Sequence, residues 1–333
     1  MKRKSGNFII SLDFELLWGM RDHETIKTYG ENISGVRNNL PRILDLFKTY
    51  DIKATFATVG FLFASNKKDL ISMSPKDIPN YFDENLSPYG EYFKKVKGSE
   101  NIDKYHFASE LIDLIKEYSG HEIATHTFSH YYSLEGGQTI NEFKADLLAA
   151  IRIAEKNKTK LKSIFFPRNQ INSDYLKICL ELGIQSYRGN ENAWFYKIEC
   201  SKKEKIKKRF FRLLDSYINI SGYNTYAISD IEGKPYNIHA SRFLRPYNPK
   251  LKIFDGLKLN RILKSMMYAA KNGEIFHLWW HPHNFGKYQE QNLNFLIKIL
   301  NFYKLLHQKY NFESITMEEL SYKLNKQQGE LYI

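Results

Sequence analysis

The chain has 333 residues, 43% of them hydrophobic and 26% charged, which is the balance of an ordinary folded globular protein. No run approaches the roughly 20 apolar residues of a membrane-spanning helix. The two cysteines, Cys179 and Cys200, are too few for a disulfide framework. The net charge of +12 is spread along the chain without a recognised nucleic-acid-binding motif, so we expect no nucleic-acid partner.

The first residues, Met-Lys-Arg-Lys, are typical of the start of a secretion signal. The apolar run that follows is only Phe8-Ile-Ile10, and Asp13 interrupts it before any cleavage site. We therefore expect a cytoplasmic protein.

Apolar, β-rich segments alternate with amphipathic helical patterns along the chain. Apolar residues at helical spacing from 36 to 47 predict one helix, and the capping box Thr139-x-x-Glu142 predicts the start of another. Gly120 predicts the end of a third. The segments that predict strands are 8–15, 54–61, 122–126, 163–167, 185–188, 238–243 and 274–280.

About seven strands that alternate with helices predict an α/β fold with a parallel sheet. Polar residues fall at or just past the C-terminal ends of several predicted strands. In a (β/α) barrel these ends converge on one face, whereas an open, doubly wound sheet would spread most of them apart. We therefore predict a single barrel domain over residues 1–333, with loop insertions over the C-terminal face at about 64–104 and 216–235.

One predicted helix is strongly basic. The run Lys202–Arg209 leads into the apolar Phe210–Leu214, so lysines and arginines accompany an apolar stripe. Such a helix could make peripheral contact with an anionic membrane surface, or meet a pyrophosphate-linked substrate or nucleic acid. A solvated surface helix is the simpler interpretation.

Two carboxylates end the first predicted strand. Side chains alternate along a strand, so Asp13 and Glu15 project to the same side. Carboxylates at the end of a buried strand are costly unless a cation faces them. The structural alternative is an arginine partner, and the candidates are Arg21, Arg168 and Arg188.

Two histidines, His126 and His130, follow the predicted strand 122–126. Neutral imidazoles are usual ligands of zinc-like ions, and residues four apart on one helical turn lie about 5–6 Å apart at Cβ. This spacing alone is weak, because ten histidines produce chance pairs. Joined by a carboxylate from Asp13 or Glu15, the pair predicts a metal site.

Five segments form a familiar set: Ser11–Glu15, Lys53–Gly60, Gly120–His130, Phe165–Asn169 and Trp280–Pro282. Together they resemble the polysaccharide deacetylases of carbohydrate esterase family four, which share the NodB homology domain. The resemblance runs from about residue 8 to about residue 320 without the insertions, and the histidine segment is its most specific part. It implies a distorted, incomplete (β/α) barrel with one divalent metal, zinc first, and cobalt, nickel or manganese as alternatives.

The resemblance also implies roles for the acids and histidines. Asp13 would be the catalytic base, and Glu15 would bind the metal with His126 and His130. The family has two adjacent aspartates, the first a base and the second a ligand. Here one residue separates the acids and the second is glutamate, so the order of Asp13 and Glu15 stays open.

The third motif departs from the family, which places an arginine two residues before a proline-aromatic pair, where it steadies the base. Here Arg168 follows Pro167. We expect Arg168 to reach the base from this position, with Arg188 as the substitute. A main-chain amide donor for the reacting carbonyl would come from Arg168 or Asn169.

The late segment supplies a general acid by the same resemblance, with His281 as the first candidate and His283 as the second. Aromatic rings could stack on a sugar, and arginines could bind a phosphate or carboxylate of the substrate. The candidates for these substrate contacts are Asn169, Arg188, Trp194, Trp279, Trp280, Arg242, Arg245 and His283.

The implied reaction is hydrolysis of an N-acetyl group on an amino sugar. Because we expect a cytoplasmic location, the expected substrate is a glycan, glycolipid or surface-polysaccharide precursor. One alternative is hydrolysis of a cyclic amide or imide, as in an allantoinase, on the same barrel. Another is a non-catalytic carbohydrate-binding protein.

Overall fold

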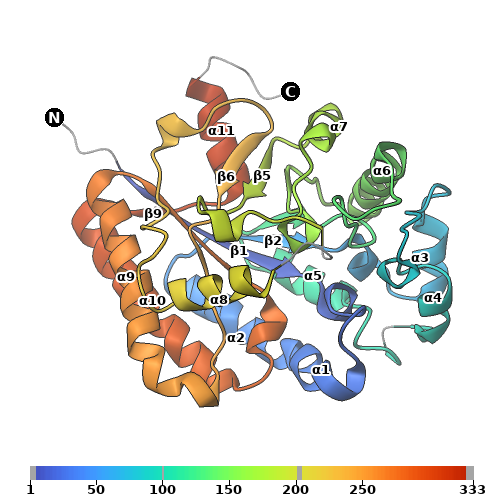
Figure 1. The fold of residues 1–333 in the computed structure, drawn as a ribbon, viewed down its shortest axis with the longest axis horizontal. Helices are drawn as coiled ribbons and strands as arrows, with labels where there is room; N and C mark the ends of the chain where they lie inside the picture. Colours follow the sequence, from blue (N-terminus) through green and yellow to red (C-terminus); the bar gives the residue numbers. More distant parts are fainter. Residues whose placement is uncertain (1–4, 100, 201–204, 328–333) are drawn as a thin grey trace.

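The computed structural model describes residues 5–99, 101–200 and 205–327. Short strands and longer helices alternate along this chain (Figure 1). The strands are β1 (Asn7–Phe14), β2 (Ala54–Thr58), β3 (Glu122–Thr125), β4 (Ser163–Ile164), β5 (Ser186–Gly189), β6 (Tyr236–His239), β7 (Arg242–Phe243), β8 (Ile275–Trp280) and β9 (Glu313–Ser314). The helices are α1 (Ile26–Ser34), α2 (Val36–Thr49), α3 (Lys67–Met73), α4 (Glu91–Lys95), α5 (Ser109–Glu117), α6 (Ile140–Lys156), α7 (Leu176–Glu181), α8 (Ile206–Asp215), α9 (Asp255–Asn272), α10 (Gln289–Tyr310) and α11 (Met317–Gln327).

The strands form one sheet in the order β6-β5-β4-β3-β2-β1-β8-β7, and β9 pairs with β1 in addition. The ladders between these strands are parallel. At the centre, Leu12 of β1 lies opposite Phe56 of β2 and Trp280 of β8. The predicted α/β class with a parallel sheet is therefore confirmed.

The sheet curls until its two edges meet. Strands β6 and β7 stand at opposite ends of the sheet order, yet only Ala240 and Ser241 separate them in the chain. The Ala240 N–H donates to the carbonyl of Gly189 at the end of β5 (2.8 Å), and the Ser241 N–H donates to that of His277 on β8 (2.8 Å). This two-residue link joins both edges without a β6–β7 ladder among the described strand pairs, which gives the distorted, incomplete barrel that we expected.

The predicted strand 238–243 is wrong as one element, because this link divides it. Its first half lies in β6, which pairs with β5, and its second half forms β7, which pairs with β8. The other predicted strands are present. Those at 8–15, 54–61, 122–126 and 163–167 end earlier than predicted, 185–188 ends one residue later and 274–280 ends where predicted, and β9 was not predicted.

Alternation along β1 divides the core into two layers. Phe8, Ile10, Leu12 and Phe14 pack against the surrounding helices. Ile9 points the other way, into an interior cluster that also contains residues of β2, β3, β6 and α11. The odd-numbered side chains of β1 therefore face the barrel interior, and this side leads from Ile9 to Asp13 at the C-terminal end.

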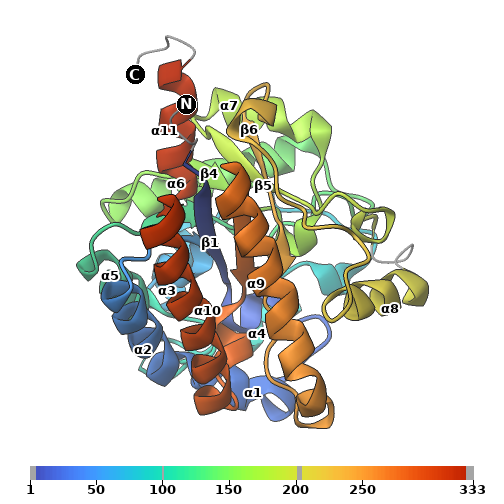
Figure 2. The same cartoon turned by 90° about the vertical axis from the view of Figure 1, so that its left-hand side faces the viewer.

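Helices cover the outer face of the sheet. Figure 2 shows α9 and α10 running side by side over β1, and α2 lies beside them. The predicted helix of residues 36–47 is α2, and α6 begins after Thr139 with both capping-box hydrogen bonds. Helix α5 ends at Glu117, and Gly120 makes the turn into β3 with φ of +88°. Within the described residues, no helix combines the length and apolar character needed to cross a membrane.

A polar network closes the N-terminal end of the barrel. Glu122 of β3 accepts hydrogen bonds from the Thr55 hydroxyl (2.8 Å), the Ser163 hydroxyl (2.5 Å) and the Glu318 N–H at the start of α11 (2.9 Å). Burial, opposed only by these hydrogen bonds, raises the pKa of Glu122 to about 7. Glu122 thus ties α11 to the floor of the barrel.

The two predicted insertions have some structure of their own. Segment 64–104 contains α3 and α4, and its Tyr92 and Phe93 rings lie 5.9 and 6.2 Å from the Trp18 ring. In segment 216–235, Tyr226 forms an antiparallel bridge with Ile275. The single-domain organisation stays a prediction.

Candidate active site

Three buried side chains meet at the C-terminal end of the barrel. Glu15 Oε2 lies 3.2 Å from His126 Nε2 and 3.0 Å from His130 Nε2. One ligand atom from each of the three residues can be chosen so that all lie within 4.8 Å of one another. Glu15 directly follows β1, and His126 directly follows β3, so the parallel sheet brings together residues more than 100 positions apart in the chain.

Gly19 makes room for the Glu15 carboxylate. A Cβ atom at this position would lie 2.0 Å from Glu15 Cδ, too close for any side chain. The sequence analysis did not single out this glycine, and its place four residues after Glu15 gives no pattern that could have found it.

The histidine pair lies on a tight loop, not on the helical turn that its spacing suggested. Thr127 and His130 adopt left-handed φ values of +63° and +59°. The buried Asp146 of α6 holds this loop from behind, because its carboxylate accepts the N–H groups of Phe128 (2.7 Å) and Ser129 (3.1 Å). Burial raises the pKa of Asp146 to about 6 despite these hydrogen bonds.

These donors fit a divalent metal ion. The His126 Nδ1 faces the main-chain carbonyl of Phe165 at 3.0 Å, and a carbonyl only accepts, so this nitrogen carries the proton. In neutral His126, Nε2 then presents a lone pair to the Glu15 carboxylate, and two electron-rich atoms at 3.2 Å need a cation between them. Burial lowers the pKa of His130 to about 4, which keeps its imidazole in the neutral form that binds metals.

Glu15 is ionised in this setting. Burial alone would raise the pKa of its carboxyl group, but the charge of His281 and the proximity of the His126 and His130 imidazoles hold it well below its usual value. The carboxylate therefore suits the ligand role that the family resemblance implied for Glu15.

Asp13 has a different partner. Arg188 donates to both of its carboxylate oxygens, at 2.6 and 2.7 Å, in a buried bidentate pair. Burial would raise the pKa of Asp13, but the charges of Arg188, His126 and His281, together with the Arg188 hydrogen bonds, lower it. Arg188 is itself held by Asn169 Oδ1 (2.9 Å) and lies against the Trp279 ring, with its Cζ 4.1 Å from the ring centroid.

Arg168 does not make the contact predicted for it. The chain turns through left-handed φ values at Arg168 and Asn169, and the Arg168 guanidinium pairs with Asp22 and lies 4.3 Å from the centroid of the Tyr132 ring. Arg188, the predicted substitute, faces Asp13 instead. The Asn169 N–H is also engaged, by the Phe166 carbonyl (2.8 Å), so the amide-donor role expected there is not supported.

Two further histidines approach the acids. His281 Nε2 lies 3.7 Å from Asp13 Oδ2 and 3.6 Å from Glu15 Oε1, and its Nδ1 faces Asn284 Oδ1 at 3.3 Å. His283 is buried, 4.0 Å from Glu15, and burial lowers its pKa to about 3. His281 therefore lies where an acid or base would act, and His283 lies behind it.

The tryptophans differ from the prediction. Trp280 is fully buried and stacks on Phe285, so its predicted sugar contact is wrong. Trp194 is 55% exposed beside Phe211. The ring that lines the cavity is Trp279, which alternation along β8 places on the same side as His281. This alternation was available in the sequence.

Of the three arginines predicted to bind substrate, Arg188 holds Asp13, and Arg242 and Arg245 differ from each other. Arg242 is buried in an ion pair with Asp215, so its predicted free role toward substrate is wrong. Arg245 is half-buried and donates from Nε to the Ser216 hydroxyl at 2.6 Å. Both border the same cavity.

This cavity has a volume of about 690 Å³, which suits a small ligand or one or two sugar rings. The acids and histidines form one side, and α8, β7 and Trp279 form another. The lining residues include Asp13, Glu15, His130, His281, Asn169, Trp279, Phe243, Arg212 and Arg245.

Comparisons with known proteins agree with this picture. Residues 29–187, slightly less than half of the chain, match the family model described as polysaccharide deacetylase. No curated protein matches the sequence.

Among solved structures, a candidate polysaccharide deacetylase from Mycobacterium smegmatis is similar, with 13% identity, a TM-score of 0.59, and coverage of 98% of this chain and 92% of that one. Another from Pseudomonas aeruginosa PAO1 gives 10% identity, a TM-score of 0.53, and coverage of 96% and 90%. Puue allantoinase gives 11% identity, a TM-score of 0.52, and coverage of 96% and 89%. At these identities the structures show a shared fold. The family-model match over residues 29–187 is what bears out the resemblance to the polysaccharide deacetylases.

Proposed function

We propose that this protein is a metal-dependent hydrolase that removes the N-acetyl group from an amino sugar in a glycan, glycolipid or surface-polysaccharide precursor. The observation that carries the proposal is the approach of two imidazole nitrogens to one Glu15 oxygen, at 3.0 and 3.2 Å, beside an arginine-held aspartate. The family match supports deacetylation as the chemistry.

Glu15, His126 and His130 would hold the ion, for which we propose zinc, with cobalt, nickel or manganese as alternatives. When bound, such an ion supplies a water of lowered pKa and polarises the acetyl carbonyl. Three protein ligands leave coordination positions open, as catalytic sites require.

Asp13 would accept the proton of the attacking water, since its carboxylate lies beside the ligands without taking part in their cluster. Arg188 is a positioning residue that fixes both carboxylate oxygens. His281 would donate a proton to the nitrogen as the carbon–nitrogen bond breaks, because an amine leaves only when protonated. Its Nε2 lies 3.7 Å from Asp13, so the two groups can act on one small substrate group. The products are acetate and the free amine.

The test is acetate release from N-acetylglucosamine oligomers by the full-length protein, with its metal content measured. We expect Glu15→Ala and His126→Ala to lose bound metal and to lower turnover at least about a thousandfold. Asp13→Asn should keep the metal and lose turnover. His307→Ala, at an exposed position of α10 outside the cavity, is the matched control. Full turnover by His126→Ala would refute the proposal.

The alternative reactions have direct assays. Ring opening of allantoin or small imides without acetate release would favour cyclic amide hydrolysis, on the fold shared with Puue allantoinase. Saturable sugar binding without either product would favour a carbohydrate-binding protein.

We also propose peripheral contact with an anionic membrane surface through α8. Ile206 and Phe210 of this helix are 83% and 58% exposed, and Lys205, Lys207 and Arg209 are exposed beside them. Residues 202–204 of the predicted basic run lie outside the described residues. Co-sedimentation with vesicles of phosphatidylglycerol, but not phosphatidylcholine, is the expected result. The cytoplasmic location stays a prediction.

A further inference from the structure

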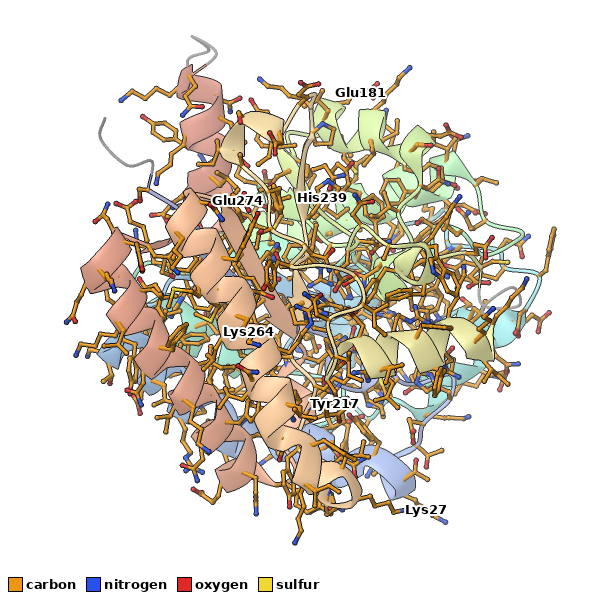
Figure 3. All side chains as sticks on the ribbon, turned by 60° about the vertical axis from the view of Figure 1, so that its left-hand side comes forward. Lys27, Glu181, Tyr217, His239, Lys264 and Glu274 are labelled. Atoms are coloured by element: carbon orange, nitrogen blue, oxygen red, sulfur yellow. The ribbon has the colours of Figure 1, made fainter. Side chains whose placement is uncertain are left out.

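The wall of the cavity opposite the metal ligands is rich in arginine. It is built from α8, the segment after it, and β7. Tyr217, just after α8, contacts Phe254 before α9 with ring centroids 5.9 Å apart, which joins this wall to the start of α9. Tyr217 is labelled in Figure 3. The arginines that line it are Arg209, Arg212, Arg242 and Arg245.

One buried carboxylate, Asp215, neutralises part of this charge, and its capacity is used up. It pairs with Arg242 and with Arg261 (3.5 Å). It also accepts the Tyr196 hydroxyl (2.9 Å), the Ser221 hydroxyl (2.7 Å) and two main-chain N–H groups. Asp215 is fully buried behind the wall, so it has no capacity for the arginines at the cavity surface.

Two further acids, Glu199 and Glu191, line this part of the cavity. Glu199 pairs with Lys208 at 2.9 Å. Glu191 is buried and accepts the Trp279 indole N–H at 3.3 Å, and burial raises its pKa, which disfavours its charge. The Arg245 guanidinium donates from Nε to the Ser216 hydroxyl, a neutral group, at 2.6 Å.

The positive charges of Arg212 and Arg245 repel each other. Burial lowers the pKa of Arg212, and the charge of Arg245 lowers it further. Burial likewise lowers the pKa of Arg245, and Arg242 contributes in the same direction. Two partly buried guanidinium groups that oppose each other would be stabilised by an anion.

Arg245 lies near enough to the reacting groups for a single ligand to contact both. The Phe243 ring lies 5.8 Å from Arg245 Cζ and 5.9 Å from the His281 ring. It also contacts Trp279, with centroids 4.6 Å apart. A single aromatic ring is thus near both Arg245 and the proposed general acid.

We propose that Arg212 and Arg245 form an anion subsite that binds a phosphate or carboxylate on the same molecule whose acetyl group meets Glu15 and the two histidines. The inference rests on the proposed function and narrows its substrate to anionic N-acetylated amino sugars. The sequence analysis named Arg242 and Arg245 as candidate arginines. Because Arg242 pairs with Asp215, Arg212 takes its place as the second arginine of the subsite.

The test is calorimetric binding to the full-length, metal-loaded protein. The probes are N-acetylglucosamine, N-acetylglucosamine 1-phosphate and N-acetylmuramic acid, which are neutral, phosphorylated and carboxylated. We expect at least one anionic probe to bind about tenfold or more tightly than the neutral sugar, and this advantage to shrink as salt rises. The anionic probe that binds more tightly identifies the group.

Variants locate the effect. Arg245→Gln and Arg212→Gln should each reduce the anionic advantage about 10- to 100-fold while binding of the neutral sugar stays unchanged. Arg245→Lys should retain part of it. The control Arg42→Gln removes the same charge from the pair with Glu290 on the outer helices, and it should change nothing. Equal binding of all probes, or an equal loss in Arg42→Gln, would overturn the proposal.

A last variant separates this inference from the proposed function. His126→Ala removes a metal ligand, so its anionic advantage should persist if arginines provide it and vanish if the metal does. Vanishing would overturn the subsite. Arginine-dependent binding without acetate release from any probe would instead refute the deacetylase function while the subsite stands.

Discussion

The two ends of the barrel each bury a glutamate, and the two carboxyl groups behave in opposite ways. At the N-terminal end, Glu122 is surrounded by hydroxyls and one N–H, and burial raises its pKa to about 7. At the C-terminal end, Glu15 faces histidines, and its pKa falls well below the usual value. Burial acts in the same direction on both, so the partners decide the sign.

This difference distinguishes a carboxyl group with a structural role from one with a chemical role. A buried carboxyl group among hydroxyls can exist in its neutral form and serve as a hydrogen-bonding tie, as Glu122 does between β3 and α11. A buried carboxylate beside imidazoles keeps its charge and can bind a cation. Perturbed groups are thus informative about function only together with the chemistry of their neighbours.

The largest effect is expected at Arg188, which stabilises the charged form of the Asp13 carboxyl group. Arg188→Met should lower turnover about 10²- to 10⁴-fold, because Asp13 loses the donors that fix both of its oxygens. Arg188→Lys should recover only part, since a lysine cannot form the bidentate pair. Steady-state kinetics and metal analysis check this. If Arg188→Met kept full turnover per folded protein, Asp13 would not depend on Arg188.

Next comes Glu122. Below pH 4.5 its carboxyl group is protonated in both folded and unfolded chains, and its favourable contribution is complete. As the pH rises toward 7 and above, the unfolded chain releases the proton more readily and this contribution is lost.

Glu122→Gln removes this titration, so its free energy of unfolding should rise relative to the native protein by up to about 3 kcal/mol between pH 4.5 and pH 8. Urea unfolding at both pH values measures the change. A difference independent of pH would show that the pKa of Glu122 is not raised in the folded chain.

The smallest effect is expected at Asp146. Like Glu122, it is a buried carboxyl group that holds segments together through hydrogen bonds, but it does so at the C-terminal end of the barrel. Asp146→Asn replaces one acceptor oxygen of the histidine loop with an amide donor, which opposes the N–H groups of Phe128 and Ser129. We expect metal affinity to fall about 10- to 100-fold. Competition with a chelator measures it, and Asn157→Asp at the end of α6 is a charge control. An unchanged affinity would show that the loop holds its shape without Asp146.

Much of the barrel could be predicted because its signals are local. Strand segments, helix caps and the loop after β3 each depend on neighbouring residues, and parallel strand order then brings Glu15 to the histidines. Non-local choices could not be predicted. Nothing in residues 238–243 shows that the chain leaves one edge of the sheet and joins the other.

The arginine near Asp13 illustrates the same limit. Arg168 follows β4 and Arg188 lies near the end of β5, and only the left-handed turn at Arg168 directs its side chain to Asp22. Trp279 is a different case. Alternation along β8 already separated it from Trp280, and applying that rule strictly would have placed the correct ring in the cavity.

The link of Ala240 and Ser241 has a consequence for which molecules fit. Consecutive Cα atoms are about 3.8 Å apart, so His239 and Arg242 can never be more than about 11 Å apart, whatever the sheet does. Both link residues are also fastened, one to each edge. The circumference of the barrel is therefore limited by the covalent chain at this link. The sheet cannot open between β6 and β7 to admit a bulky polymer. Selection by size then falls to the side chains that line the cavity, Phe243 and Trp279 among them.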